Sequence, residues 1–410
     1  MSLRDDAQRI IDAALGAAMP DTAVRKALAQ FEQPKGKLIL IAAGKAAWQM
    51  AKAAQEALGD RIAGGAVITK YGHVRSGLPG LELYEAGHPV PDENSFAATQ
   101  RAIELVQDLG KEDAVLFLLS GGGSALFEKP LVSGEALQDV TRQLLACGAD
   151  IVEMNTIRKR LSAVKGGRFA KLCAPAQVFS IVLSDIIGDP LDMIASGPAY
   201  PDSSTCGQAR RIVEKYGLAL SPEATALLDI ETPKALDNVQ TQITGSVRQL
   251  CRAAEETCRE MGYEPVVLTA SLRCQAREAG SFLASMAQYH ADTKKSLAFI
   301  AGGETVVRLT GKGKGGRNQE LALAAAQEIA GLEDVAVFSL GSDGTDGPTD
   351  AAGGYCDGGT RDCLLAQGIE IPRVLEENDA YHALSACDGL LMTGPTGTNV
   401  NDLNVLLIRR

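Results

Sequence analysis

The sequence predicts an α/β protein with two α/β/α domains, the first built on a doubly wound, mostly parallel sheet and the second on a smaller mixed sheet. Three observations support this prediction. Short, continuously apolar runs are followed by glycine turns and then by helical segments, which is the pattern of parallel strands buried between helices. The chain has 410 residues, too many for one ordinary core. Its 43 glycines and 4% aromatic residues suit tightly packed strand–helix units.

The elements of the first domain follow in chain order. Residues 4–31 have a helical apolar face, and "KLILIAAG" at 37–44 is an apolar run typical of a buried parallel strand. The same alternation predicts strands at 64–70, 80–86, 113–119 and 177–183, and helical segments at 45–58, 94–109 and 134–170. Because such units place successive strands parallel in one sheet, we expect a Rossmann-like first domain.

A second alternation begins near Val239, after a charged and weakly periodic stretch at 203–236 that we interpret as the connection between domains. Strands are expected at 240–245, 264–269, 296–304, 306–310 and 335–344, with helices at 246–261, 273–289 and 317–330, and two closing strands within 389–409. We therefore divide the chain into domains at 1–236 and 237–410. A ligand site is expected in the cleft between them, where strand ends meet.

Charge and composition narrow the function. The formal net charge of −11 argues against a nucleic-acid or anionic-membrane binder, so an anionic substrate would need a local basic pocket. No apolar run approaches the roughly 18 residues of a membrane-spanning helix, and "MSLRDD" does not resemble a signal peptide. Nine cysteines without CxxC pairs predict a reducing setting and no structural zinc. We expect a cytoplasmic protein that binds a small molecule.

The stretch "AGGETVVRLTGKGKGGRNQELALAAAQ" at 301–327 ends a strand in a glycine-rich turn and then opens a helix. Glycines let a backbone approach a ligand, and a helix N-terminus offers free N–H groups to anions. With Lys312, Lys314 and Arg317 added, the stretch is typical of an anion site. A flexible, solvated loop is the alternative.

Two further polar stretches follow buried strands of the first domain. "IAAGKAAW" places Lys45 at a strand end, but the first glycine and the Ser/Thr of a Walker motif are missing. "LSGGGSALF" offers backbone N–H groups and two hydroxyls from Ser120 to Ser124, although Leu126 stands where GxGxxG needs glycine. Both stretches suit phosphate, while an exposed lysine and a plain tight turn remain the simpler interpretations.

Acidic stretches follow two other strands. "VLSDIIGDPLDMIASGP" contains Asp185, Asp189 and Asp192, which are natural Mg²⁺ ligands or helix caps. "LGSDGTDGPTDAAGGY" contains Asp343 and Asp346 in a Gly/Thr loop that does not match a calcium motif.

The basic run "NTIRKRLSAVKGGRFA" suggests another anion contact, with a solvated helix face as the default. His88, between a glycine and a proline, is interpreted as structural. Cations, glycine turns and carboxylates at strand ends together indicate phosphoryl transfer, in which cations and a metal neutralise the transferring group.

These stretches together resemble the class II glycerate kinase family, whose C-terminal part is known as the MOFRL domain, here about residues 296–405. The resemblance covers nearly the whole chain in order and rests on "AAGKAA", "HPVPDENS", "LSGGGSALF", "NTIRKRLSAVKGGR", "LSDIIGDPLDMIASGP", "AGGETVVRL", "GKGGRNQELAL", "GSDGTDGPTDAAG" and "TGPTGTNVNDL". Members of the family phosphorylate D-glycerate with ATP and Mg²⁺, usually to 2-phosphoglycerate. The resemblance implies the same activity and cofactors here.

The resemblance also assigns residues. The family's cleft lysine matches Lys45, its C-domain arginine matches Arg317, and the aspartates of its SD..GDP motif match Asp185 and Asp189, which we take as catalytic and, for the two aspartates, metal-binding. From residue chemistry we assign ATP binding to Ser120, Gly121, Gly122, Gly123, Ser124, Lys165, Lys312, Gly315, Gly316 and Asn318. Substrate binding is assigned to Asn155, Arg158, Glu304 and Asp343.

Two alternatives stay open. Relatives encoded near tartrate-utilisation genes are labelled hydroxypyruvate reductase, but an NAD(P)H enzyme needs a complete GxGxxG and an acidic residue closing a second strand. A non-catalytic anion-binding protein is the other alternative. The sequence also leaves open 3-phosphoglycerate as the product and a homodimer as the assembly.

Overall fold

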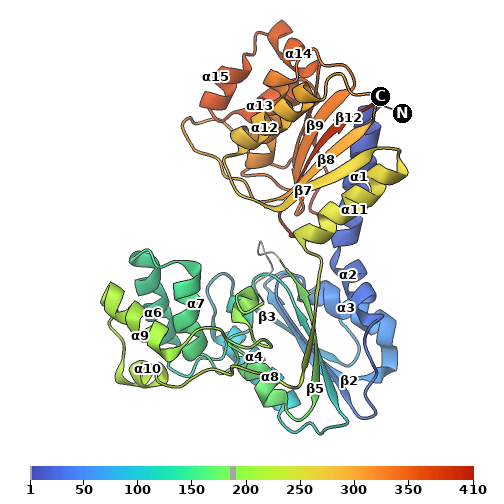
Figure 1. Cartoon of the computed structure of the whole chain (residues 1–410). Helices are drawn as coiled ribbons and strands as arrows, with labels where there is room; N and C mark the ends of the chain where they lie inside the picture. Colours follow the sequence, from blue (N-terminus) through green and yellow to red (C-terminus); the bar gives the residue numbers. More distant parts are fainter. Residues whose placement is uncertain (1, 185–190) are drawn as a thin grey trace. The chain divides into compact units, whose positions relative to one another are not determined.

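The computed structural model describes residues 2–184 and 191–410. These residues form two compact units (Figure 1). Within the described residues, the N-terminal unit comprises Pro20–Ser184 and 191–244, and the C-terminal unit comprises 2–19 and Gly245–Arg410. No helix in this part of the chain is both long and apolar enough to cross a membrane.

A six-stranded parallel sheet in the order β3-β2-β1-β4-β5-β6 forms the core of the N-terminal unit. Its strands are β1 (Leu38–Ala43), β2 (Ile62–Lys70), β3 (Leu81–Ala86), β4 (Ala114–Leu119), β5 (Gln177–Leu183) and β6 (Val239–Thr244). Strands β1 and β4 are buried along their whole length, as their unbroken apolar runs predict. This is the strand order of a doubly wound Rossmann fold, which confirms the predicted fold class.

Helices cover both faces of this sheet (Figure 1). One face carries α2 (Pro20–Leu28) and α3 (Ala47–Leu58), and the other carries α4 (Glu93–Val106) and α8 (Arg168–Cys173). The unit also contains three short helical elements, namely η1 (Gly59–Arg61), α5 (Gly123–Leu126) and η2 (Ile194–Ser196).

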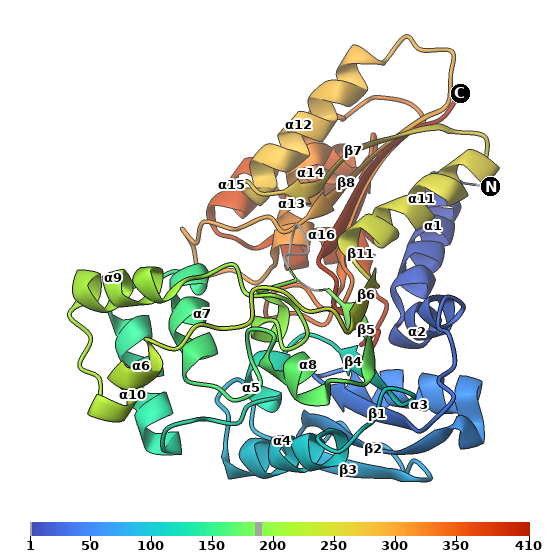
Figure 2. The same cartoon turned by 60° about the horizontal axis from the view of Figure 1, so that its bottom comes forward.

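Four more helices form a separate cluster at one side of the N-terminal unit (Figure 2). They are α6 (Gly134–Ala146), α7 (Ile151–Arg160), α9 (Cys206–Tyr216) and α10 (Pro222–Leu227). Their shared apolar core includes Leu137, Leu144, Ile157 and Ile212. The charged stretch expected to connect the domains therefore belongs to a packed part of the first unit.

The C-terminal unit has a mixed sheet in the order β11-β10-β9-β12-β8-β7, also with six strands. The strands are β7 (Glu264–Leu272), β8 (Leu297–Gly303), β9 (Val335–Gly341), β10 (Gly353–Asp357), β11 (Leu390–Leu391) and β12 (Asp402–Ile408). Only β7 and β8 pair in parallel, and the other described pairs are antiparallel.

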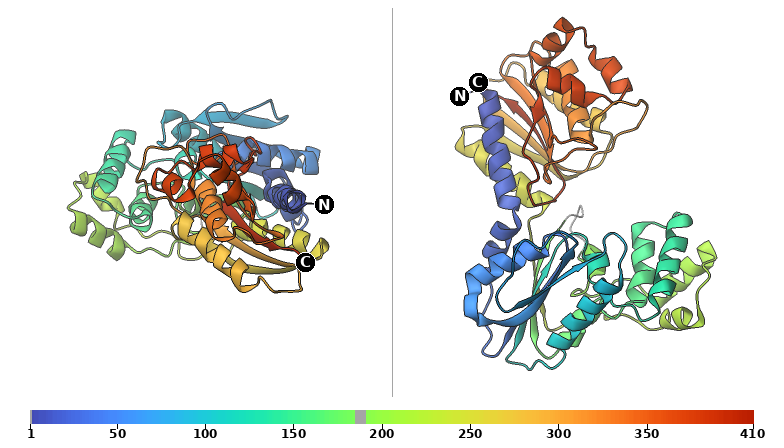
Figure 3. Two further views of the ribbon diagram at one scale, coloured as in Figure 1. Left: turned by 90° about the horizontal axis from the view of Figure 1, so that it is seen from above. Right: turned by 180° about the vertical axis from the view of Figure 1, so that it is seen from behind.

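Helices α1 (Leu3–Ala18) and α11 (Val247–Glu260) pack side by side on one face of this sheet (Figure 3). Helices α12 (Ala276–Tyr289) and α13 (Arg317–Glu328) pack on the opposite face (Figure 1). The remaining helices are α14 (Thr360–Ala366), α15 (Ile371–Glu376) and α16 (Ala380–Ala386).

The unit boundary differs from the expected division at 236/237. Strand β6 pairs with β5 in parallel and completes the first sheet, so the chain leaves this unit after Thr244. The first helix packs on α11, which places residues 2–19 in the C-terminal unit. The run 306–310, expected to be a strand, makes only an isolated bridge between Val306 and Gln275.

Candidate active site

The switch point of the first sheet lies between β1 and β4, where the chain leaves the sheet in opposite directions. Lys45 follows β1, and Ser120 follows β4. The Lys45 N–H donates to the carbonyl of Gly121 at 2.9 Å, and the Ala46 N–H donates to Ser120 Oγ at 3.1 Å. These bonds join the two turns at the edge of the sheet where open α/β sheets bind ligands.

Glycine is required at two positions of these turns. A Cβ on Gly44, whose φ is +125°, would lie 2.2 Å from Ser120 Oγ. A Cβ on Gly122, whose φ is +83°, would lie 3.0 Å from the His88 ring and 3.1 Å from Lys45 Cγ. The side chains of Lys45 and His88 therefore gather over the bare backbone of Gly122.

His88 is a site neighbour that the sequence did not reveal as one. Burial lowers its pKa, and the positive charge of Lys45 lowers it further, so both effects favour the neutral imidazole. The only sequence signal was its position shortly after the strand β3.

Past Gly122, the side chain of Ser124 contacts a polar cluster that includes Ser196 and Asn155. Ser196 Oγ donates to Asn155 Oδ1 at 2.8 Å and lies 3.1 Å from Ser124 Oγ. Arg158 donates to the Ser124 carbonyl at 3.0 Å. Ala195 and Ser196 both have positive φ, at 49° and 62°, and such strained non-glycine backbone is concentrated at functional sites. Ser196 was not expected from sequence.

Lys165 takes a different role from the expected ATP contact. Its side chain is fully buried, donates to the carbonyls of Ser124 and Phe127 at 2.8 and 3.0 Å, and pairs with buried Glu128 at 3.2 Å. Burial lowers the pKa of Lys165 to about 8. The Lys165 ammonium is therefore shielded from solvent, and its hydrogen bonds stabilise the chain that follows the glycine turn.

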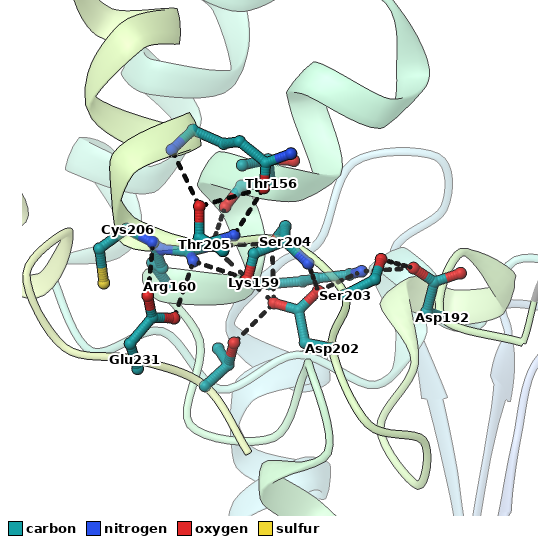
Figure 4. A network of polar contacts seen from close by, with 12 residues as sticks. Thr156, Lys159, Arg160, Asp192, Asp202, Ser203, Ser204, Thr205, Cys206 and Glu231 are labelled. Carbon is teal, nitrogen blue, oxygen red and sulfur yellow. Dashed lines mark hydrogen bonds and ion pairs between the residues drawn. The ribbon is translucent and has the colours of Figure 1, made fainter. Parts of the chain in front are cut away.

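Most of the basic run on α7 is also internal (Figure 4). Lys159 pairs with Asp202 at 2.9 Å, and Arg160 donates to Ser204 Oγ at 3.0 Å and pairs with Glu231 at 3.4 Å. Both basic side chains are completely buried. This network anchors the loop after η2 to the helical cluster, so the anion contact suggested for this run is not available at these two residues.

The aspartates nominated for metal binding, Asp185 and Asp189, lie outside the described residues. Their described neighbour Asp192 pairs with Lys159 at 3.6 Å and accepts a hydrogen bond from Ser203 at 2.7 Å. Within residues 2–184 and 191–410, no group of three or more His, Cys, Asp or Glu side chains is arranged to hold a metal.

In the C-terminal unit, the polar residues gather where β8 and β9 end and β12 begins. Arg317 donates to both carboxylate oxygens of buried Asp402, at 2.6 and 2.9 Å, and its Nη1 lies 3.4 Å from Glu304. The hydrogen bond to Asp402 raises the pKa of Arg317. One third of the Arg317 side chain remains exposed, so the ion pair fixes a cation that can still reach a ligand.

The N-terminus of α13, expected as an anion seat, already holds the carboxylate of the chain's own Asp346. Asp346 accepts the backbone N–H groups of Asn318 and Gln319 at 3.2 and 2.9 Å, and it also accepts the Asn318 side-chain amide at 3.2 Å. Burial raises the pKa of Asp346 to about 6, although these donors act in the opposite direction. A Cβ on Gly316 would lie 2.2 Å from Asp346 Cγ, so this glycine makes room for the cap. Asn318 is buried within the cap.

The glycine-rich loop packs on the chain itself. A Cβ on Gly311 would collide with the backbone of Glu377, and one on Gly313 would collide with Asp379 as well. The Gly313 N–H donates to the Glu377 carbonyl at 2.7 Å. The loop still borders a pocket of about 590 Å³. Its lining includes Glu304, Lys312, Gly315, Gly316, Arg317 and the apolar residues Val306, Val307 and Leu309.

Asp343 lies apart from that pocket's lining. Its carboxylate accepts the N–H of Thr345 at 3.0 Å, and its carbonyl accepts the N–H of Thr396 at 3.2 Å. The residue therefore joins the turn after β9 to the Gly/Thr segment before β12.

The chain is thus an α/β protein of two units, each with basic and glycine-rich turns at its strand ends. Two family models match it, a domain of unknown function, DUF4147, over residues 6–229 and the MOFRL family over residues 297–402. The sequence is 51% identical over 413 residues to D-glycerate 2-kinase of Thermotoga maritima, covering 99% of both chains. It is 38% identical over 436 residues to glycerate 2-kinase of Pyrococcus horikoshii, covering 100% of this chain and 98% of the other.

A protein of Agrobacterium vitis named "Putative hydroxypyruvate reductase" is also 38% identical, covering 100% of this chain and 95% of the other. Among solved structures, glycerate kinase of Thermotoga maritima matches with a TM-score of 0.95 over 99% of both chains. The chain belongs to the glycerate kinase family with DUF4147 and MOFRL domains. The resemblance found from the sequence motifs is thereby confirmed.

Proposed function

We propose that the protein transfers the γ-phosphoryl group of ATP to D-glycerate and yields 2-phosphoglycerate. The observation that carries this proposal is the 51% identity, over 99% of both chains, to a protein named D-glycerate 2-kinase. The chemistry of the strand ends in both units agrees with it, because phosphoryl transfer depends on positioning and on cations that neutralise developing charge.

Lys45 supplies one such cation in the N-terminal unit. It is exposed, follows β1 at the switch point and lies against Gly122, where no side chain separates it from the turn. A phosphoryl group bound at the 120–124 turn would lie within reach of its ammonium group. We assign Lys45 to stabilising negative charge on the transferring group.

Arg317 supplies a second cation in the C-terminal unit. Asp402 fixes its guanidinium, and Lys312 borders the same pocket. The pocket also has an apolar wall at Val306 and Leu309, which suits a nucleotide base, while the two cations suit its phosphates. We assign this pocket to ATP.

Asn155 and Arg158, first assigned to the substrate, are better described as positioning residues. Arg158 donates to the Ser124 carbonyl, and Asn155 accepts from Ser196, whose Oγ lies 3.1 Å from Ser124 Oγ, so both act through Ser124. Glu304 and Asp343 stay in the proposal as polar groups at the strand ends of the C-terminal unit.

Mg²⁺ would accompany ATP and would neutralise part of the phosphate charge, as it does in reactions of this class. Asp185 and Asp189 remain the proposed ligands on the strength of their motif.

The residues after β1 and at the end of β2 disfavour a nicotinamide dinucleotide. A dinucleotide site needs a glycine-rich turn after the first strand and an acidic residue near the end of the second. Here Lys45 stands in the first turn and Lys70 ends β2. Two lysines at these positions favour a phosphorylated ligand over the ribose hydroxyls of NAD.

Phosphorus-31 NMR of the reaction product tests the proposal. The purified protein is incubated with ATP, Mg²⁺ and D-glycerate, and parallel samples omit glycerate or contain L-glycerate. We expect a 2-phosphoglycerate resonance only in the complete D-glycerate sample. A 3-phosphoglycerate resonance would overturn the regiochemistry, and the absence of any phosphoglycerate would overturn the function.

A further inference from the structure

A small basic pocket adjoins Lys45 on the side of the N-terminal unit occupied by α3 and the loop after β2. Its volume is about 160 Å³, and its lining consists of Lys45, Trp48, Gln49, Gly72, His73 and Arg75. Pockets for drug-sized ligands begin at roughly 300 Å³, so this one suits a ligand of a few heavy atoms and not a nucleotide.

Within the described part of the chain, the two permanent cations of the pocket have no carboxylate partner within ion-pair distance. Of the residues that line the pocket, Lys45 and Arg75 form no ion pair with any described residue, although the chain carries a net charge of −11. The nearby carboxylate of Glu85 accepts the backbone N–H of Val74 at 2.9 Å. This hydrogen bond lowers the pKa of Glu85 and fixes its carboxylate against the loop after β2. Cations left unpaired beside a hollow are a recognition site for an anion.

The walls of the pocket are held in place by hydrogen bonds. Buried Trp48 donates its indole N–H to the Ser76 carbonyl at 2.9 Å, which ties the loop to α3. The Lys45 carbonyl accepts from Thr69 Oγ1 at 3.3 Å and lies 3.1 Å from His73 Nδ1. The first turn of α3, which has no side-chain cap, adds the positive end of a helix dipole.

We propose that this pocket binds the carboxylate of the three-carbon hydroxy acid that accepts the phosphoryl group, with Arg75 and His73 as specificity-determining residues. The inference rests on the proposed kinase function, and it supplies the acceptor subsite that Asn155 and Arg158 do not provide. Lys45 borders both the pocket and the 120–124 turn, so a carboxylate held here would place the hydroxyls of a short acid beside the turn.

Arg75→Gln tests the proposal, with Lys52→Gln as a matched control. Both cations lie over the Trp48 ring, with Arg75 Cζ 5.8 Å and Lys52 Nζ 5.7 Å from its centroid, but only Arg75 lines the pocket. We expect Arg75→Gln to raise KM for D-glycerate at least tenfold and to leave KM for ATP and Tm unchanged. Arg75→Lys should recover part of the loss because it keeps the charge, and Lys52→Gln should match the wild type.

Calorimetric titration with D-glycerate in the absence of ATP separates this inference from the proposed function. Loss of the binding heat in Arg75→Gln, with retention in Lys52→Gln, supports the pocket even for a protein that releases no ADP. An unchanged KM and binding heat in Arg75→Gln would overturn the inference while leaving the kinase function standing. A rise in KM for ATP alone would overturn it too, because the pocket would then hold a phosphate of the nucleotide.

Discussion

The guanidinium of Arg317 and the carboxylate of Asp402 form a two-pronged ion pair with hydrogen bonds of 2.6 and 2.9 Å. Asp402 begins β12 and is almost completely buried, whereas Arg317 begins α13 and stays partly exposed. The pair therefore joins the start of α13 to the start of β12. It fixes a cation at the border of the 590 Å³ pocket beside the glycine-rich loop. Such geometry suits a side chain that positions charge for a ligand.

Asp402→Asn should lower kcat/KM by about 10- to 100-fold, because a misplaced cation loses much of its effect on the transferring group. Steady-state assays with varied ATP measure the change. Asp334→Asn is the matched control, since Asp334 pairs with Arg409 at 3.0 Å on the exposed surface of the same unit. Equal activity in both variants would mean that the Arg317–Asp402 pair is structural only.

Lys45→Met should lower kcat by about 100- to 1,000-fold, the usual effect of removing one charge-stabilising group. Its Tm should stay close to that of the wild type, because Lys45 is exposed and forms no ion pair with a described residue. Lys165→Met should behave differently and lose about 3–5 kcal/mol of unfolding free energy, since it removes the nearest counter-charge of buried Glu128, which then keeps, among the described residues, only Arg158 at 4.0 Å. Thermal melts beside kinetic assays distinguish the two, and a stable Lys165→Met protein would contradict the assignment of Lys165 to structure.

The contrast between these lysines shows how far the sequence can predict the site. The apolar runs ending at Ala43 and Leu119 predict parallel strands, so the polar residues after them must share one sheet edge. Sequence cannot say which lysine faces solvent, because burial depends on partners distant along the chain. Lys165 and Glu128 are distant along the chain, and only the folded structure brings them into contact.

The glycine-rich loop gives the same lesson in the C-terminal unit. Its composition indicates an anion site, and the anion found at the helix start is Asp346, which lies about 30 residues further along the chain. Similarly, no local signal distinguishes β6 from a strand of the second domain, since only its pairing with β5 assigns it. The strand–helix alternation was predictable, and long-range contacts decided the rest.

Gly316→Ala should destabilise the protein by about 1–3 kcal/mol, because the new methyl group would displace the Asp346 cap from α13. Urea unfolding measures the change. Gly16→Ala is the control, since Gly16 lies in α1 with no atom within 4 Å of the added Cβ, and the helix should gain about 0.5–1 kcal/mol. Equal stability of the two variants would argue against the cap.

The stability should also depend on Asp202 at acidic pH. Burial by itself would raise the pKa of Asp202, but the hydrogen bond from Thr232 and the charge of Lys159 outweigh it and lower the value to about 2. Because the folded state holds the carboxylate charged, its contribution is present above about pH 4 and is lost as the pH falls towards 2. The difference corresponds to about 2 kcal/mol.

Asp202→Asn removes this titration. Urea unfolding of both proteins between pH 4.5 and pH 2.5 should show the variant less stable at pH 4.5, with the gap narrowing as the pH falls. A gap that stays constant over this range would contradict the role of the Asp202 charge.

A paired assay on the wild-type protein tests the central proposal most directly. One reaction follows ADP release with D-glycerate, ATP and Mg²⁺, and the other follows NADH and NADPH loss with hydroxypyruvate. We predict ADP release that requires D-glycerate, and no nucleotide oxidation. Oxidation of NADH or NADPH without ADP release would contradict the kinase proposal and would assign the strand-end cations to a dinucleotide.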